Sequence, residues 1–218
     1  MGIADRIENI LDKPLKVIAK DLEYDKSNIF ILENKIEELK SECPQIYSNL
    51  ESCGHQKDER TKEQYAKDLI ASWIFEDIFL KELKSAELEV ELNGADRERK
   101  ILSSSQTKTT SDYIIKKDVK NKNIELMSSY TNYWKNSKKI DLRDNKYITM
   151  TSKEVLLLCI DMFNKEFFII DIKNCSAIHI PEHKPYGGKP AYSISLKSIT
   201  PQAYNIKEIA KALKSYLT

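Results

Sequence analysis

The chain has 218 residues, of which 41% are hydrophobic and 32% charged, and its formal net charge is +1. This length supports one good core with a small appended unit. The balanced charge excludes a uniformly basic nucleic-acid coat but allows a local basic cleft. No apolar run approaches the roughly 20 residues that cross a bilayer, and no glycine-rich nucleotide motif is present, which excludes membrane-spanning proteins and P-loop enzymes.

The beginning of the chain and its cysteines favour a cytoplasmic location without a membrane partner. The first 15 residues carry charges throughout and lack the apolar core of a signal peptide. The four cysteines form no CxxC pair. Reduced thiols in a reducing compartment are therefore expected.

Residues 1–55 are predicted to form a small helical unit that dimerises or contacts DNA. Ser27 can cap a long helix that Pro44 ends. Residues 15–34 have the spacing of a helix-turn-helix, although Glu23 stands in the turn where glycine is usual. A plain helical support unit is the alternative.

The next predicted helix covers residues 61–84 and carries one charged residue on its apolar stripe. Glu76 lies three residues after Trp73 and four before Leu80, which places it on the face that these two residues share. A carboxylate on a core-facing stripe is costly unless it is paired or bound to a metal. Glu76 is therefore a candidate metal ligand, and the alternative is a side chain that reaches solvent at the edge of the stripe.

A second domain over residues 61–218, after a polar linker at residues 51–61, is predicted to be an α/β core. The apolar alternation predicts strands at 88–92, 112–115, 123–129, 155–162, 166–172, 178–180 and 192–196. The hairpin of 155–162 and 166–172 is fully apolar, so it is the expected sheet centre. The last helix is capped by Asn205.

Two carboxylates mark the candidate site. Asp112 starts one predicted strand and Glu125 lies inside the next, separated by Lys, Asp and Asn residues suited to a hairpin turn. Adjacent antiparallel strands can bring the two groups within a few ångströms of each other. Paired oxygen ligands are what Mg²⁺ needs when it shares its coordination shell with a phosphate.

The order of helix, acidic strands and apolar hairpin over about residues 64–196 resembles the PD-(D/E)xK nucleases, type II restriction endonucleases in particular. Ser111-Asp112 stands in place of Pro-Asp, and Glu125-Leu126-Met127 in place of (Asp/Glu)-x-Lys. The resemblance implies a mixed central sheet flanked by helices. It also implies Mg²⁺ held by Asp112, Glu125 and the Leu126 carbonyl, with Glu76 as a further acid. The implied activity is sequence-specific cleavage of double-stranded DNA by a homodimer, because two strands require two active sites.

Met127 departs from this pattern, because methionine can neither donate a proton nor carry charge. Another residue can supply the missing charge, and Lys146 is the nearest candidate. Alternatively, the metal alone suffices, or the chain is a weakened form, natural or engineered, that binds DNA and metal without cutting. Cleavage by this chain therefore stays open at this stage.

Four cations are candidate DNA contacts: Arg97, Arg99 and Lys100 after an Asn-Gly turn, and Lys135 beside aromatic residues. Two other interpretations compete with the nuclease. One is a non-catalytic DNA-binding regulator on a degenerate nuclease fold, and the other is a helical interaction protein. Under either, Asp112 and Glu125 can be ordinary strand residues.

Overall fold

A computed structural model describes the chain except residues 1, 54–59, 95–96, 104, 107–110 and 218. The chain forms two compact units, a helical unit of Met1–Phe79 and Ala95–Lys108 and a sheet unit of Leu80–Gly94 and Thr109–Thr218. The prediction of an α/β protein with a mixed sheet and helices is confirmed. Most of the predicted linker, residues 54–59, lies outside the described residues.

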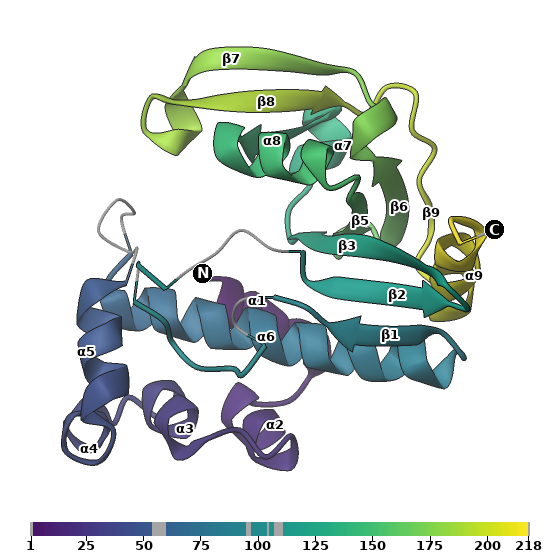
Figure 1. The fold of residues 1–218 in the computed structure, drawn as a ribbon. Helices are drawn as coiled ribbons and strands as arrows, with labels where there is room; N and C mark the ends of the chain where they lie inside the picture. The colour runs from purple at the N-terminus through teal and green to yellow at the C-terminus, as the bar shows by residue number, and fades with distance from the viewer. Residues whose placement is uncertain (1, 54–59, 95–96, 104, 107–110, 218) are drawn as a thin grey trace. The chain divides into compact units, whose positions relative to one another are not determined.

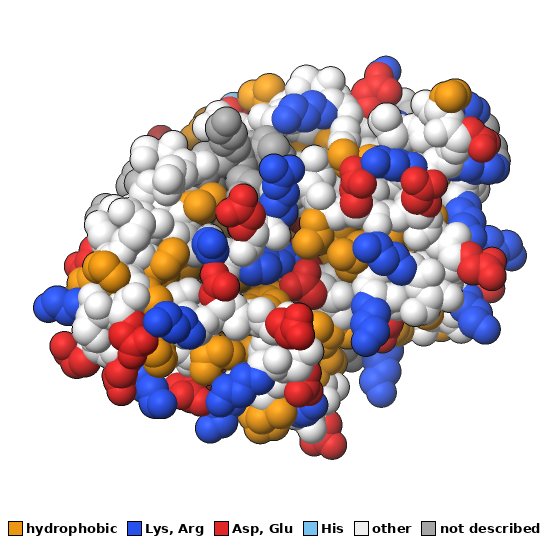
Figure 2. Space-filling view, turned by 60° about the horizontal axis from the view of Figure 1, so that its bottom comes forward, with side chains coloured by type: hydrophobic (Ala, Val, Ile, Leu, Met, Phe, Trp, Pro, Cys, Tyr) orange, Lys and Arg blue, Asp and Glu red, His pale blue; other side chains and the backbone are white. Residues whose placement is uncertain are grey.

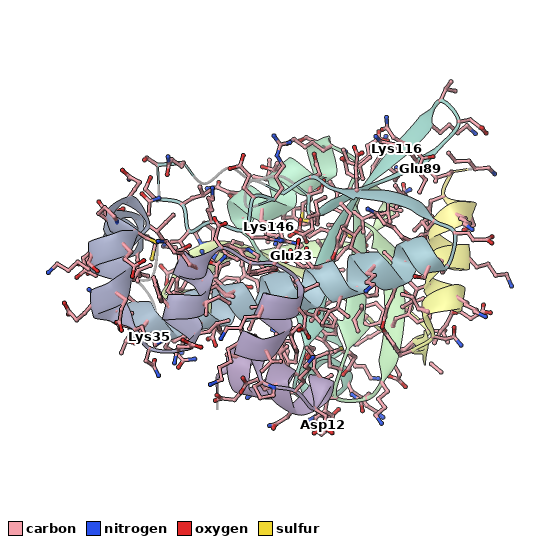
Figure 3. All side chains as sticks on the ribbon, turned by 90° about the horizontal axis from the view of Figure 1, so that it is seen from below. Asp12, Glu23, Lys35, Glu89, Lys116 and Lys146 are labelled. Carbon is pink, nitrogen blue, oxygen red and sulfur yellow. The ribbon has the colours of Figure 1, made fainter. Side chains whose placement is uncertain are left out.

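Short helices followed by one long helix make up the helical unit (Figure 1). They are α1 (Ile3–Leu11), α2 (Leu15–Asp21), α3 (Lys26–Leu32), α4 (Ile36–Glu42), α5 (Pro44–Ser52) and α6 (Lys62–Ser85), of which the last residues, from Leu80 on, belong to the sheet unit. The first three end before left-handed residues, Asp12, Glu23 and Asn34, with φ of 50°, 58° and 60°. Figure 3 labels Asp12 and Glu23 at these turns.

The predicted long helix between Ser27 and Pro44 is wrong, because the left-handed backbone at Asn34 divides it into α3 and α4. Ser27 lies inside α3, whose N-cap is Asp25. The predicted long helix at 61–84 is confirmed as α6. Its buried face includes Trp73.

Side-chain amides hold the chain that follows β1 (Glu89–Leu92) on the helical unit. Asn28 Nδ2 on α3 donates to the Arg99 carbonyl and Asn49 Nδ2 on α5 donates to the Ile101 carbonyl, both at 2.8 Å. These bonds satisfy backbone carbonyls in a segment whose described residues belong to no helix or strand. The helical unit therefore extends beyond the predicted range 1–55 and includes this segment.

The sheet unit contains a six-stranded sheet in the order β1-β2-β3-β5-β6-β9 and a three-stranded sheet in the order β4-β8-β7. Only the β3–β5 pairing is parallel among the described strands. The remaining strands are β2 (Tyr113–Lys117), β3 (Lys120–Ser129), β4 (Lys139–Arg143), β5 (Leu156–Asp161), β6 (Glu166–Asp171), β7 (Ala177–His183), β8 (Lys189–Ser195) and β9 (Gln202–Ala203).

The apolar hairpin predicted at the sheet centre is confirmed as β5 and β6. Every residue of β5 is buried, because the strand has neighbours on both sides and side chains covering both faces. The sequence did not predict that the C-terminal strands β7 and β8 would form a separate sheet with β4.

Helices α7 (Tyr133–Ser137) and α8 (Asp144–Ser152) lie between the two sheets (Figure 1). One apolar cluster joins these layers, with Trp134 from α7, Met150 from α8, Cys159 from β5 and Ile194 from β8. Two short 3-10 helices follow, η2 (Ile172–Asn174) and η3 (Lys184–Tyr186). Helix α9 (Ile206–Ser215) ends the chain, and the predicted Asn205 cap is confirmed by bonds from the Lys207 and Glu208 amides.

The surface carries both charges without a continuous basic area on the face in view (Figure 2). Lysine and arginine side chains there alternate with aspartate and glutamate, as the net charge of +1 leads one to expect. In the part of the chain that the structure describes, no helix has both the length and the apolar character needed to cross a membrane.

Candidate functional site

The strand register brings Asp112 next to Glu125. The last regular pair of β2 and β3 is Tyr113 with Ile124, so the following step along both strands sets Asp112 opposite Glu125. Directly opposite side chains in an antiparallel pair point to the same face, with Cβ atoms about 5 Å apart. The two carboxylates therefore share one face of the six-stranded sheet.

Asp112 is fixed by the ends of two strand ladders. Its Oδ2 accepts from the Leu126 amide at 2.7 Å, and its carbonyl accepts from the Asn93 amide at 2.8 Å. The N–H and C=O of a strand residue point toward the same neighbouring strand. The Leu126 carbonyl is therefore directed to the side on which Asp112 lies, so it can add a third oxygen to the two carboxylates.

Lys146 reaches this carboxylate pair from the first turn of α8. Its ammonium forms an ion pair with Glu125 Oε1. The Glu125 side chain is 7% exposed, whereas that of Lys146 is 39% exposed. The structure thus brings together Asp112, Glu125 and the lysine that the sequence offered in place of Met127.

The electrostatic balance at Lys146 keeps its ammonium charged. Burial favours the neutral amine, but attraction to Glu125, its hydrogen bond and the charge of Asp112 outweigh burial, so the pKa of Lys146 is raised above its usual value. A lysine with a raised pKa is a poor general base at neutral pH. Its chemical use is as a fixed positive charge.

Met127 has a packing role. It lies two residues after Glu125 on β3, and therefore on the same face, and packs against the apolar cluster that contains Trp134 and Met150. Its thioether fills space in that cluster. The cation absent from the strand comes from α8.

Tyr186 and Arg143 lie beside Lys146, and the sequence did not single them out. The Arg143 guanidinium stands 5.5 Å from the centre of the Tyr186 ring, and the Tyr186 hydroxyl donates to the Asp141 carbonyl at 2.7 Å. Burial and Asp141 raise the pKa of Tyr186, against the opposing charges of Arg143 and Lys146. Arg143 could have been noticed, because it lies three residues before Lys146, whereas the contact with Tyr186 depends on the fold.

Glu76 and Arg99 are partners in the helical unit. Glu76 Oε2 accepts from Arg99 Nη1 at 2.8 Å, which accounts for a carboxylate on the core-facing stripe of α6. Arg99 is only 8% exposed and also donates to Asp77. Its guanidinium is therefore occupied by internal carboxylates and is not presented to a DNA phosphate.

The other predicted cations are on the surface. Arg97 and Lys100 are exposed in the helical unit, where Lys100 Nζ lies 3.6 Å from Asp25. Lys135 is exposed on α7 in the sheet unit, with its Nζ 3.5 Å from Asn164 Oδ1. Only Lys135 belongs to the same unit as the carboxylate pair.

The carboxylate oxygens of Asp112 and Glu125 are the kind of ligand that Mg²⁺ prefers, but they are few in number. Within the described residues, no group of three or more His, Cys, Asp or Glu side chains is placed to hold a metal ion. Mg²⁺ is commonly held by one or two carboxylates and completes its shell with water and substrate phosphate. Two carboxylates and one carbonyl therefore fit a metal that binds together with its substrate.

No protein-family model matches the chain, and no curated protein matches its sequence significantly. The function is therefore inferred from the site itself. It combines two adjacent carboxylates, the Leu126 carbonyl of β3 and a charged lysine in the sheet unit.

Proposed function

We propose that the protein is a Mg²⁺-dependent endodeoxyribonuclease that hydrolyses phosphodiester bonds of double-stranded DNA, of the type II restriction kind. The observation that supports this most is the ion pair between Lys146 and Glu125 directly beside Asp112. An acid pair with an attached cation is the composition that a phosphate and a divalent ion require together.

The fold supports the same proposal. The order on which the nuclease resemblance rests, a long helix, two acidic strands and an apolar hairpin, corresponds to α6, β2 with β3, and β5 with β6. These strands are consecutive neighbours in one mixed sheet.

Asp112, Glu125 and the Leu126 carbonyl would hold the metal. When bound, Mg²⁺ supplies charge neutralisation at the phosphate and a more acidic water. Glu125 holds the Lys146 ammonium at the site, where it can donate to a non-bridging phosphate oxygen and stabilise the charge that develops there. A homodimer would supply one such site for each strand of the duplex.

The competing proposal is a non-catalytic DNA-binding regulator. In its favour, α2 and α3 form a short helix pair with Glu23 left-handed in the turn, at φ 58°. Against it, Ser27 and Asn28 at the start of α3 are buried, and Asn28 donates to the Arg99 carbonyl. In a helix-turn-helix these N-terminal residues reach the base edges.

Cleavage of long, unmethylated duplex DNA separates the two proposals. With Mg²⁺ we expect discrete fragments from the wild-type protein and none from Asp112→Asn, since the amide removes a charged metal ligand but preserves the shape of the side chain. Both proteins should bind DNA with salt-sensitive affinity. Binding without cleavage by the wild type, at any divalent ion, would favour the regulator.

The rate of cleavage should not depend on the titration of Lys146 between about pH 6 and 9. Its pKa is raised, so the ammonium persists below that pKa and is lost only as the pH rises through it. The pH profiles of wild type and Lys146→Arg are therefore expected to be parallel over this range, because arginine stays charged. A decline between pH 7 and 9 in the wild type alone would show that Lys146 loses its proton there.

A further inference from the structure

A cavity of about 170 Å³ lies beside α7 in the sheet unit. Trp134 and Phe168 line it, with ring centres 5.6 Å apart and planes at 66°. Lys135, Lys138, Asp161 and Glu166 also line it. Both rings are almost buried, with Trp134 6% and Phe168 5% exposed, so the cavity combines mainly apolar walls with charges of both signs.

The charged side chains that line the cavity differ in whether they already have partners within the protein. Asp161 accepts from the Phe163 amide at 3.1 Å and from the Asn164 amide at 3.0 Å, so its carboxylate holds the β5–β6 turn. Within the described residues, Lys135, Lys138 and Glu166 form no ion pair. Two ammonium groups and one carboxylate are therefore available to a ligand.

The size of the cavity limits what can enter. Pockets for drug-sized ligands have volumes of about 300–1,000 Å³, whereas this cavity has about 170 Å³. A single planar heterocycle fits that space, and an attached sugar and phosphate would remain outside. The two lysine side chains are exposed, so they can meet such a phosphate.

We infer that the cavity binds the base of an unpaired nucleotide, with Lys135 and Lys138 at its phosphate and Glu166 accepting a hydrogen bond from an exocyclic amino group. Carboxylates accept from the amino group of cytosine, and the apolar side chains that line the cavity, among them Leu196, Ile199 and Pro201, suit a planar ring. Thymine has no exocyclic amino group, and its single ring N–H lies between two carbonyl oxygens, which the Glu166 carboxylate would repel. The choice of a nucleic acid as ligand rests on the proposed function.

The strand register relates the cavity to the carboxylate site. Asp161 pairs with Ser129, four residues along β3 from Glu125. At about 3.3 Å per residue the separation along the strand is roughly 13 Å, or about four base steps of DNA. The substrate would therefore be DNA with an extruded or unpaired base a few nucleotides from the bond that is cut.

Tryptophan fluorescence tests this directly, because the chain has only Trp73 and Trp134 and Trp73 is buried in the helical unit. The full chain is titrated without Mg²⁺, excited beyond nucleotide absorption, with dCMP, dAMP, dTMP and inorganic phosphate. We expect saturable quenching by dCMP and dAMP, at least about tenfold weaker binding of dTMP, and no quenching in Trp134→Phe.

Variants assign the contacts. Lys135→Ala and Lys138→Ala should each weaken dCMP binding several-fold. Glu166→Gln should reduce the difference in affinity between dCMP and dTMP. The control Lys211→Ala, on α9, should leave both affinities unchanged. Quenching by no mononucleotide, or equal quenching by inorganic phosphate, would overturn the proposal. Binding that persists in Asp112→Asn supports the cavity whether or not the chain cuts DNA, so the two proposals can fail separately.

Discussion

Replacing Lys146 by methionine is expected to lower the rate of DNA cleavage by about 10²- to 10³-fold, the usual effect of removing one donor that stabilises transition-state charge. Lys146 supplies the cation at the Asp112 and Glu125 pair, and its ammonium contacts Glu125. The measurement is the single-turnover rate of plasmid cleavage. Far-UV circular dichroism and the melting temperature show whether the variant remains folded, because Glu125 is buried and loses this ion pair.

Returning the lysine to the strand should restore much of the rate. Met127 and Glu125 are two residues apart on one face of β3, with Cα atoms roughly 7 Å apart, so Met127→Lys in the Lys146→Met background places an ammonium within reach of the Glu125 carboxylate. The matched control is Lys116→Met on β2, where the lysine pairs with Glu91 at 2.8 Å. A wild-type rate in folded Lys146→Met would contradict the assigned role of Lys146.

Local patterns made several elements predictable. The apolar run of β5 and β6, the existence of the long helix α6 and the Asn205 cap depend on residues close in sequence. The proximity of Asp112 and Glu125 follows from one hairpin and its register. The contact between Glu125 and Lys146 was a weaker prediction, since it depends on helix α8, which the sequence did not predict.

Features that depend on distant side chains were not predictable. Glu76 looked like a metal ligand because its partner, Arg99, lies 23 residues away and is held by the fold. The attachment of this segment to the helical unit depends on two side-chain amides, Asn28 and Asn49. A periodicity identifies a buried charge, but it does not identify the group that neutralises it.

Replacing Arg99 by leucine is expected to destabilise the helical unit by about 3–5 kcal/mol, the usual consequence of removing one partner from a buried ion pair. Arg99 Nε donates to both Asp77 oxygens at 3.1 and 3.2 Å, and Nη1 donates to Glu76 at 2.8 Å. The Tyr24 hydroxyl also donates to Asp77, and burial together with Asp77 raises the pKa of Tyr24, so the phenol stays protonated. Without the guanidinium, the two neighbouring carboxylates lose the positive charge that neutralises them.

The matched control is Arg97→Leu, two residues away in the same segment and exposed, for which a change within about 0.5 kcal/mol is expected. The measurement is the free energy of unfolding from urea titrations, followed by tyrosine and tryptophan fluorescence. Equal stability of Arg99→Leu and Arg97→Leu at neutral pH would mean that the buried ion pairs do not hold the segment. In that case the two asparagine amides alone would fasten it to the helices.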